Sequence, residues 1–129
     1  GVRVMFMAST GYGMADVRLL LDSAFASDAD ITAIICQTNP THVNNTLIAL
    51  QERGLRVPQD ISLMAACTQG VHQLSQGVDE MPMDPHASCV RAIDIMMEVL
   101  DGKRHDVGAV ELLPGKYIAR GTMGPRRAG

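Results

Sequence analysis

Cys67 carries a thiol, a chemically reactive side chain. It directly follows the apolar run 61–66 and precedes a turn. A thiol becomes a nucleophile when a neighbouring base lowers its pKa. His72 follows it closely in sequence, and His42 begins a segment expected to reach the same rim. This spacing does not define a catalytic triad, however. We therefore expect no catalytic residue and no enzyme.

The segment 11–16, GYGMAD, resembles part of a dinucleotide-binding glycine motif. Asp16 stands where the third glycine is needed, so the backbone does not offer the usual cradle for a pyrophosphate. The four histidines, His42, His72, His86 and His105, show no zinc-like spacing with one another or with the cysteines, and we interpret them as surface residues. The sequence therefore predicts neither a cofactor nor a metal.

Two other residues suggest binding rather than catalysis. Tyr12 is one of four aromatic residues and falls in an expected loop, where an aromatic ring can stack on a sugar or base. An ordinary half-buried loop tyrosine fits equally well. Asn39 has the position of a helix cap, and its amide could also bind a ligand hydroxyl. Asp79 and Glu80 are interpreted as solvated loop charges.

Strand-like and helical patterns alternate along the chain and must position these residues. The strand-like runs are 2–9, 31–37 and 60–67, the helical patterns are 13–27, 39–54 and 84–102, and a last extended segment is 109–122. Apolar strands separated by helices predict an α/β fold, a three-layer α/β/α arrangement with a mostly parallel sheet. In such sheets ligands bind beyond the carboxyl ends of the strands, here at 9–13, 36–40 and 66–70.

The second and third helical patterns share start and stop signals. Each has a capping residue followed by proline and ends at a glycine: Asn39, Pro40 and Gly54 in one, Asp84, Pro85 and Gly102 in the other. Apolar residues at helical spacing are expected to face the core, namely Val43, Leu47 and Leu50, then Ile93, Met96, Met97 and Leu100.

Composition excludes several classes. With 47% hydrophobic and 19% charged residues, the 129-residue chain is expected to fold as one domain rather than to be disordered. A net charge of -3 disfavours nucleic-acid binding by this segment. The apolar runs are strand-sized, which predicts no membrane span. Three cysteines, an odd number, favour a reduced cytoplasmic protein.

Three strings occur in an order that resembles the C-terminal part of the lactose/galactose-repressor family of bacterial transcription regulators. They are TAIICQTNP (32–40), ALQERGLRVPQDISLMA (49–65) and LLPGKYIARGTMGP (112–125). The most specific pieces are 54–62 and 112–122. The resemblance implies a helix-turn-helix head followed by a two-lobed core like the periplasmic sugar-binding proteins, in which an effector between the lobes changes operator affinity through lobe movement.

On this resemblance, residues 1–129 are a partial effector-binding and dimerisation domain that corresponds to most of the second lobe of a type I periplasmic-binding-protein-like domain. The stretch at about 78–84 is an exposed crossing strand. The head, most of the first lobe and the opening βα unit of the second are expected to be absent, and operator DNA would be bound only through that head. The resemblance also implies a cytoplasmic homodimer, formed by the helices starting near Met14 and Thr41 and by the loop 72–76.

The resemblance also implies the effector contacts. Tyr12 falls where members often place a stacking aromatic, and Asn39 falls on the asparagine of the family's Ala-Asn-Asp. Pro40 replaces the aspartate of that motif, so Gln37 is a candidate substitute. Cys67 and Thr68 fall on the two aspartates of the family's Gly-aromatic-Asp-Asp.

Two expected polar contacts are therefore lost, because Cys67 replaces a carboxylate and Met83 replaces a polar residue of the crossing strand. A buried sugar hydroxyl without a partner costs about 1–3 kcal/mol. Either the effector carries fewer hydroxyls, or the absent lobe binds most of it, or binding has been lost.

The sequence thus predicts the effector-sensing and dimerisation part of a transcription regulator that responds to a sugar or related metabolite. A fragment of a periplasmic solute-binding protein shares the fold and is the first alternative. An α/β enzyme using Cys67 is the second.

Overall fold

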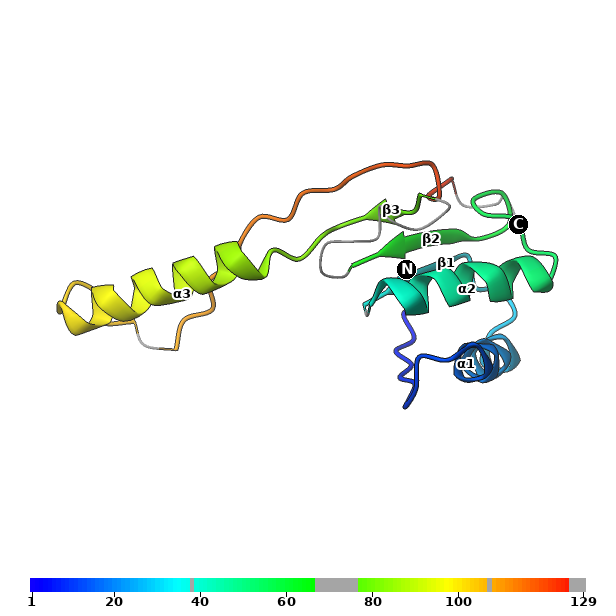
Figure 1. Cartoon of the computed structure of the whole chain (residues 1–129), viewed down its shortest axis with the longest axis horizontal. Coiled ribbons are helices and arrows are strands. Elements are labelled where there is room, and N and C mark those ends of the chain that lie inside the picture. The colour runs from blue at the N-terminus through cyan, green and yellow to red at the C-terminus, as the bar shows by residue number, and fades with distance from the viewer. Residues whose placement is uncertain (38, 67–76, 107, 126–129) are drawn as a thin grey trace.

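A short parallel sheet and two helices form the body of the protein, and a further helix projects from it (Figure 1). The computed structural model describes residues 1–37, 39–66, 77–106 and 108–125. Within them the sheet contains β1 (Ala33–Cys36), β2 (Ser62–Ala65) and β3 (Asp79–Glu80) in the order β1-β2-β3, and both pairs are parallel. The prediction of an α/β fold with a parallel sheet is confirmed.

The core lies between the sheet and two helices, α1 (Met14–Ser27) and α2 (Pro40–Glu52). Val43 and Leu47 of α2 pack with Leu63 of β2, as their spacing predicts. Val17 of α1 packs against Leu50 of α2 in a second cluster. Each fully buried side chain of this kind contributes about 1.5–3 kcal/mol to stability, so these contacts hold α2 on the sheet and α1 on α2.

The predicted helix starts and stops are also confirmed. Asn39 Oδ1 accepts a hydrogen bond from the backbone N–H of His42 at 2.9 Å. Asp84 caps α3 (Pro85–Leu100) in the same way. After the two helices, Gly54 and Gly102 have φ angles of +72° and +69°, in the left-handed region that glycine enters without strain. None of the helices in the described ranges is long and apolar enough to cross a membrane.

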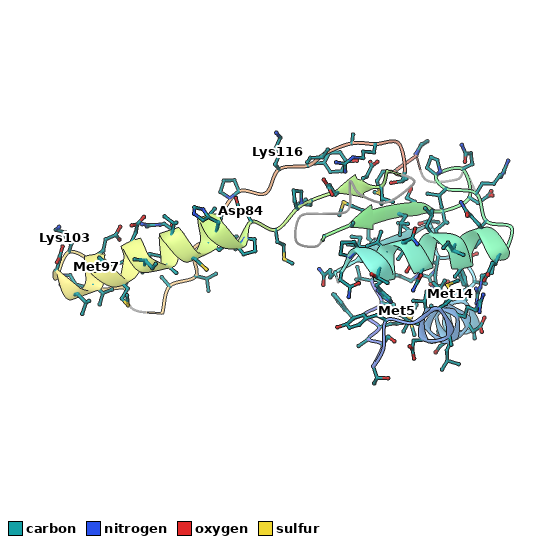
Figure 2. All side chains as sticks on the ribbon, viewed as in Figure 1. Met5, Met14, Asp84, Met97, Lys103 and Lys116 are labelled. Atoms are coloured by element: carbon teal, nitrogen blue, oxygen red, sulfur yellow. The ribbon has the colours of Figure 1, made fainter. Side chains whose placement is uncertain are left out.

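The predicted burial of the apolar stripe of α3 is wrong. No residue of α3 is buried, and Ile93, Met96, Met97 and Leu100 are all exposed. The prediction assumed that α3 packs on the sheet, whereas α3 extends away from it, with Met97 near its far end (Figure 2). Helical spacing reveals that a helix has an apolar face, but it does not say which element covers that face.

The predicted first strand, 2–9, is wrong as well. These residues form no strand, and Phe6 is 88% exposed. A strand is stabilised by hydrogen bonds to a neighbouring strand, and in the described part of the chain none pairs with this segment. The alternating apolar residues of 2–9 are therefore suited to a strand that lacks a partner here.

The C-terminal segment 117–124 lies against the sheet. The N–H of Leu63 donates to the carbonyl of Thr122 at 2.9 Å. Glu80 and Ile118 exchange two backbone hydrogen bonds as an antiparallel bridge. The prediction that Asp79 and Glu80 are solvated loop charges is wrong, because both are buried. Of the stretch predicted as an exposed crossing strand, about 78–84, residues 78–80 are buried, whereas Met81 and Met83 are exposed.

Candidate functional site

Tyr12 and Asn39 lie at the same end of α2, beyond the carboxyl end of β1, although 26 residues separate them in sequence. His42 joins them. Its backbone N–H donates to Asn39 Oδ1, and its ring meets the Tyr12 ring edge-on, with centroids 6.1 Å apart and an angle of 75° between the planes. Asn45 Nδ2 also donates to the Tyr12 carbonyl at 2.9 Å, which ties the loop to α2.

The loop that carries Tyr12 is shaped by Asp16. The N–H of Gly13 donates to Asp16 Oδ2 at 3.1 Å, and Ser9 Oγ donates to the carbonyl of Gly11 at 2.7 Å. A Cβ at Gly11 would overlap the Asp16 carboxylate, so only glycine allows this close approach. Asp16, which breaks the dinucleotide motif, instead fixes the start of α1. Tyr12 remains 55% exposed, so its ring is available for stacking.

His42 was predicted to be a surface residue, and that prediction is wrong. It is only 7% exposed, and in the described part of the chain neither ring nitrogen has a hydrogen-bond partner. Burial lowers the pKa of His42, so the ring is neutral at pH 7. Helical spacing is the sequence signal that could have indicated this burial, because Thr46, one turn after His42, lies on the same buried face of α2. Thr46 Oγ1 donates to the His42 carbonyl. His86 and His105 are exposed, as predicted.

Of the remaining predicted contact positions, the structure describes Gln37 and Met83. Gln37 is exposed directly after β1, at the same end of the sheet as Asn39. Cys67, Thr68 and the loop 72–76 lie outside the described residues. Met83, where the family has a polar residue, is exposed in the segment between β3 and α3.

The described part of this rim therefore offers the exposed ring of Tyr12 and the side-chain amides of Asn39 and Gln37, whereas the ring nitrogens of His42 are buried. These groups can stack on a ligand and exchange hydrogen bonds with its hydroxyl groups. They are not arranged as a nucleophile with a base. A separate surface hollow lies at the opposite end of α2 and shares none of these residues. It is lined by Gln51, Gly54, Leu55, Arg56 and Val57.

Comparison with known proteins identifies the family of the fold. The family model described as "periplasmic binding protein-like domain" matches residues 4–123. The chain belongs to this family. In open α/β folds ligands bind beyond the carboxyl ends of the strands, and the Tyr12–His42–Asn39 cluster lies beyond the carboxyl end of β1.

The similar solved structures are bacterial transcription regulators. One is a LacI family regulator from Bifidobacterium animalis subsp. lactis, with a TM-score of 0.69, 21% identity, and coverage of 92% of this chain and 43% of that one. Another is a LacI family regulator from Arthrobacter sp. in complex with lactose, with a TM-score of 0.63, 17% identity, and coverage of 86% and 42%. A third is CcpA of Lactococcus lactis, with a TM-score of 0.64, 11% identity, and coverage of 88% and 41%.

These matches confirm the resemblance to the lactose/galactose-repressor family at the level of the fold. The periplasmic-binding-protein-like chain spans about two-fifths of the length of these regulators. No curated protein matches the sequence.

Proposed function

We propose that this chain is the effector-sensing and dimerising part of a transcription regulator, and that its effector is a sugar or a related small metabolite. The observation that carries the proposal is the cluster of Tyr12, His42 and Asn39, which brings an exposed aromatic ring and a side-chain amide together beyond the carboxyl end of β1 in a periplasmic-binding-protein-like fold. The complex of the Arthrobacter regulator with lactose makes disaccharides the first ligands to test.

Two pairs of substitutions in the full-length protein test the site. Tyr12→Ala removes the stacking ring, whereas Tyr12→Phe keeps it. Asn39→Ala removes both the amide and the helix cap, whereas Asn39→Asp keeps an oxygen that can cap α2. We expect both alanine variants to weaken binding of whichever sugar stabilises the parent protein in a thermal-shift screen that begins with lactose. We expect Tyr12→Phe to retain most of it.

Asp84→Ala is the matched control for Asn39→Ala, because it removes the equivalent cap from α3, away from the site. It should lower stability by a similar amount, about 1 kcal/mol, and leave sugar affinity unchanged. If both Tyr12→Ala and Asn39→Ala bind the sugar as the parent does, the site assignment is refuted. If no sugar or sugar phosphate stabilises the parent, the proposed effector class is refuted.

We also propose that α3 belongs to the other lobe of a two-lobed domain and that the remainder of the same polypeptide covers its apolar face. That face consists of Val90, Ile93, Met97 and Leu100, which are all exposed. A contiguous group of exposed apolar side chains commonly marks a surface that contacts another part of a protein. The regulators with the same fold are more than twice as long as this chain, which leaves room for such a cover.

The reaction rate of Cys89 with a thiol reagent tests whether the rest of the polypeptide covers the apolar face of α3. Cys89 is exposed in the described structure and lies one turn before Ile93. In full-length protein carrying Cys67→Ser, we expect Cys89 to react with a thiol reagent much more slowly in the native state than in urea. A cysteine introduced at the exposed Asp30 should react at similar rates in both and serves as the control. Equal native and denatured rates at Cys89 would show that the α3 face is open.

A further inference from the structure

Two chain segments, residues 81–84 and 113–116, connect the body to α3, and we call them the neck. They run side by side in Figure 1, and Figure 2 shows Asp84 and Lys116 on the two of them. Their contact is close, because a Cβ on Gly115 would lie 3.2 Å from Cγ and Sδ of Met81. Any change in the direction of α3 relative to the body must bend this neck.

The buried carboxylate of Asp79 holds the C-terminal segment at the body end of the neck. It is only 2% exposed. Its Oδ1 accepts from the backbone N–H groups of Arg120, at 2.7 Å, and Thr122, at 2.8 Å, and its Oδ2 accepts from the hydroxyl of Tyr117. Its own N–H donates to Thr122 Oγ1, which in turn donates to the carbonyl of Leu63 at 2.8 Å. One carboxylate thus joins β3 to three positions of the returning segment.

These contacts divide into two groups. The contacts of Arg120 and Thr122 lie within the body, and Arg120 is held a second time by its ion pair with the buried Glu80, at 2.9 Å. Tyr117 is different, because it directly follows the neck and is 49% exposed. Its hydroxyl is the group through which the buried carboxylate holds the first residue of the returning segment after the neck.

We propose that the hydrogen bond from Tyr117 to Asp79 is a latch that sets the direction of α3, and that its release lets the neck bend while the contacts of Arg120 and Thr122 keep the C-terminal segment on the sheet. Tyr117 is thus a positioning residue for α3. The proposal goes beyond effector sensing and does not depend on which effector binds.

The test measures the distance between body and arm by pulsed electron spin resonance in the full-length protein. Spin labels are placed at Ser27, at the end of α1, and at Lys103, just beyond α3, with Cys67 and Cys89 replaced by serine. Tyr117→Phe keeps the half-exposed ring and removes only the hydroxyl, so the fold is retained. We expect the population of molecules whose label-to-label distance differs from the main distance of the parent to rise about tenfold. The lost hydrogen bond is one to an ionised group, and such bonds contribute more than those between neutral groups.

Ser62→Ala is the matched control. It removes the hydrogen bond that the N–H of Gly124 donates to Ser62 Oγ at 3.0 Å, so it loosens the same C-terminal segment at a point away from the neck. We expect its distance distribution to equal that of the parent. An unchanged distribution in Tyr117→Phe would overturn the proposal. Equal broadening in both variants would also overturn it, because the effect would then be a general loosening.

Discussion

Replacing Asp79 by asparagine tests the energetic role of its buried charge. Burial by itself raises the pKa of this carboxyl, but the hydrogen bonds from the Tyr117 hydroxyl and from the backbone of Thr122, Arg120 and Gly121 outweigh burial and lower the pKa from 3.8 to about 2. At about 1.4 kcal/mol per pKa unit, this difference corresponds to about 2.5 kcal/mol of folding free energy. Asparagine keeps the shape of the side chain and removes the charge.

The pH dependence follows from the sign of that difference. Because the folded protein binds the proton of Asp79 less tightly than the unfolded chain does, the stabilisation is fully present above pH 3.8 and is lost as the pH falls toward 2. Urea unfolding at pH 7, 5, 3 and 2, followed by circular dichroism, should therefore show Asp79→Asn less stable by about 2–3 kcal/mol at pH 7 and pH 5. The difference should shrink steadily below pH 4.

The other carboxyl groups titrate in both proteins, so their contributions largely cancel when the two free energies of unfolding are subtracted. A difference that stays constant from pH 7 to pH 2 would refute the reasoning, because the loss would then come from packing rather than from charge. A difference below about 0.5 kcal/mol at pH 7 would also refute it, since changes of that size are ordinary for surface substitutions.

Two further predictions concern the same parts of the molecule. The hydrogen bond to Asp79 raises the pKa of Tyr117 above its ordinary value of 10. Ultraviolet titration should therefore show one tyrosine ionising at higher pH than in the unfolded protein, and Tyr117→Phe should remove that step. If the parent protein lacks the step, the hydrogen bond is contradicted. The proposed homodimer uses α1 and α2, where Leu19 is exposed on α1. Leu19→Asp should shift full-length protein from dimer to monomer in analytical ultracentrifugation, and an intact dimer would exclude this part of α1 from the interface.

Structural features that depend on residues close together in the sequence could be predicted. The caps at Asn39 and Asp84 and the stops at Gly54 and Gly102 depend on residues within one or two turns of each other, and the structure has all four. The same holds for the apolar stripe of α2, because its spacing is the spacing of the helix itself. Asn39 as a ligand contact stays a prediction, since its observed role is to cap α2.

Features that depend on distant partners were not predictable. Asp79 is buried only because its hydrogen-bond donors come from a segment about 40 residues later in the chain. His42 is buried only because the loop of Tyr12 and the rest of the core close over its part of α2. A charged or polar side chain is expected in water unless the fold brings it a partner, as it does for Asp79. For His42 the fold brings packing neighbours alone, since neither ring nitrogen has a hydrogen-bond partner in the described part of the chain.

The sequence by itself determined where most of the helices and strands begin and end, the α/β class and the family resemblance, because these rest on local caps, spacing and strings of residues. Tertiary structure alone decided which apolar faces are covered and which polar groups are buried. The stripe of α3 and the segment 2–9 look like core in sequence but are exposed, whereas Asp79 and Glu80 look like surface but are buried. The physical reason is that burial is a property of two surfaces in contact, and a single segment specifies only one of them.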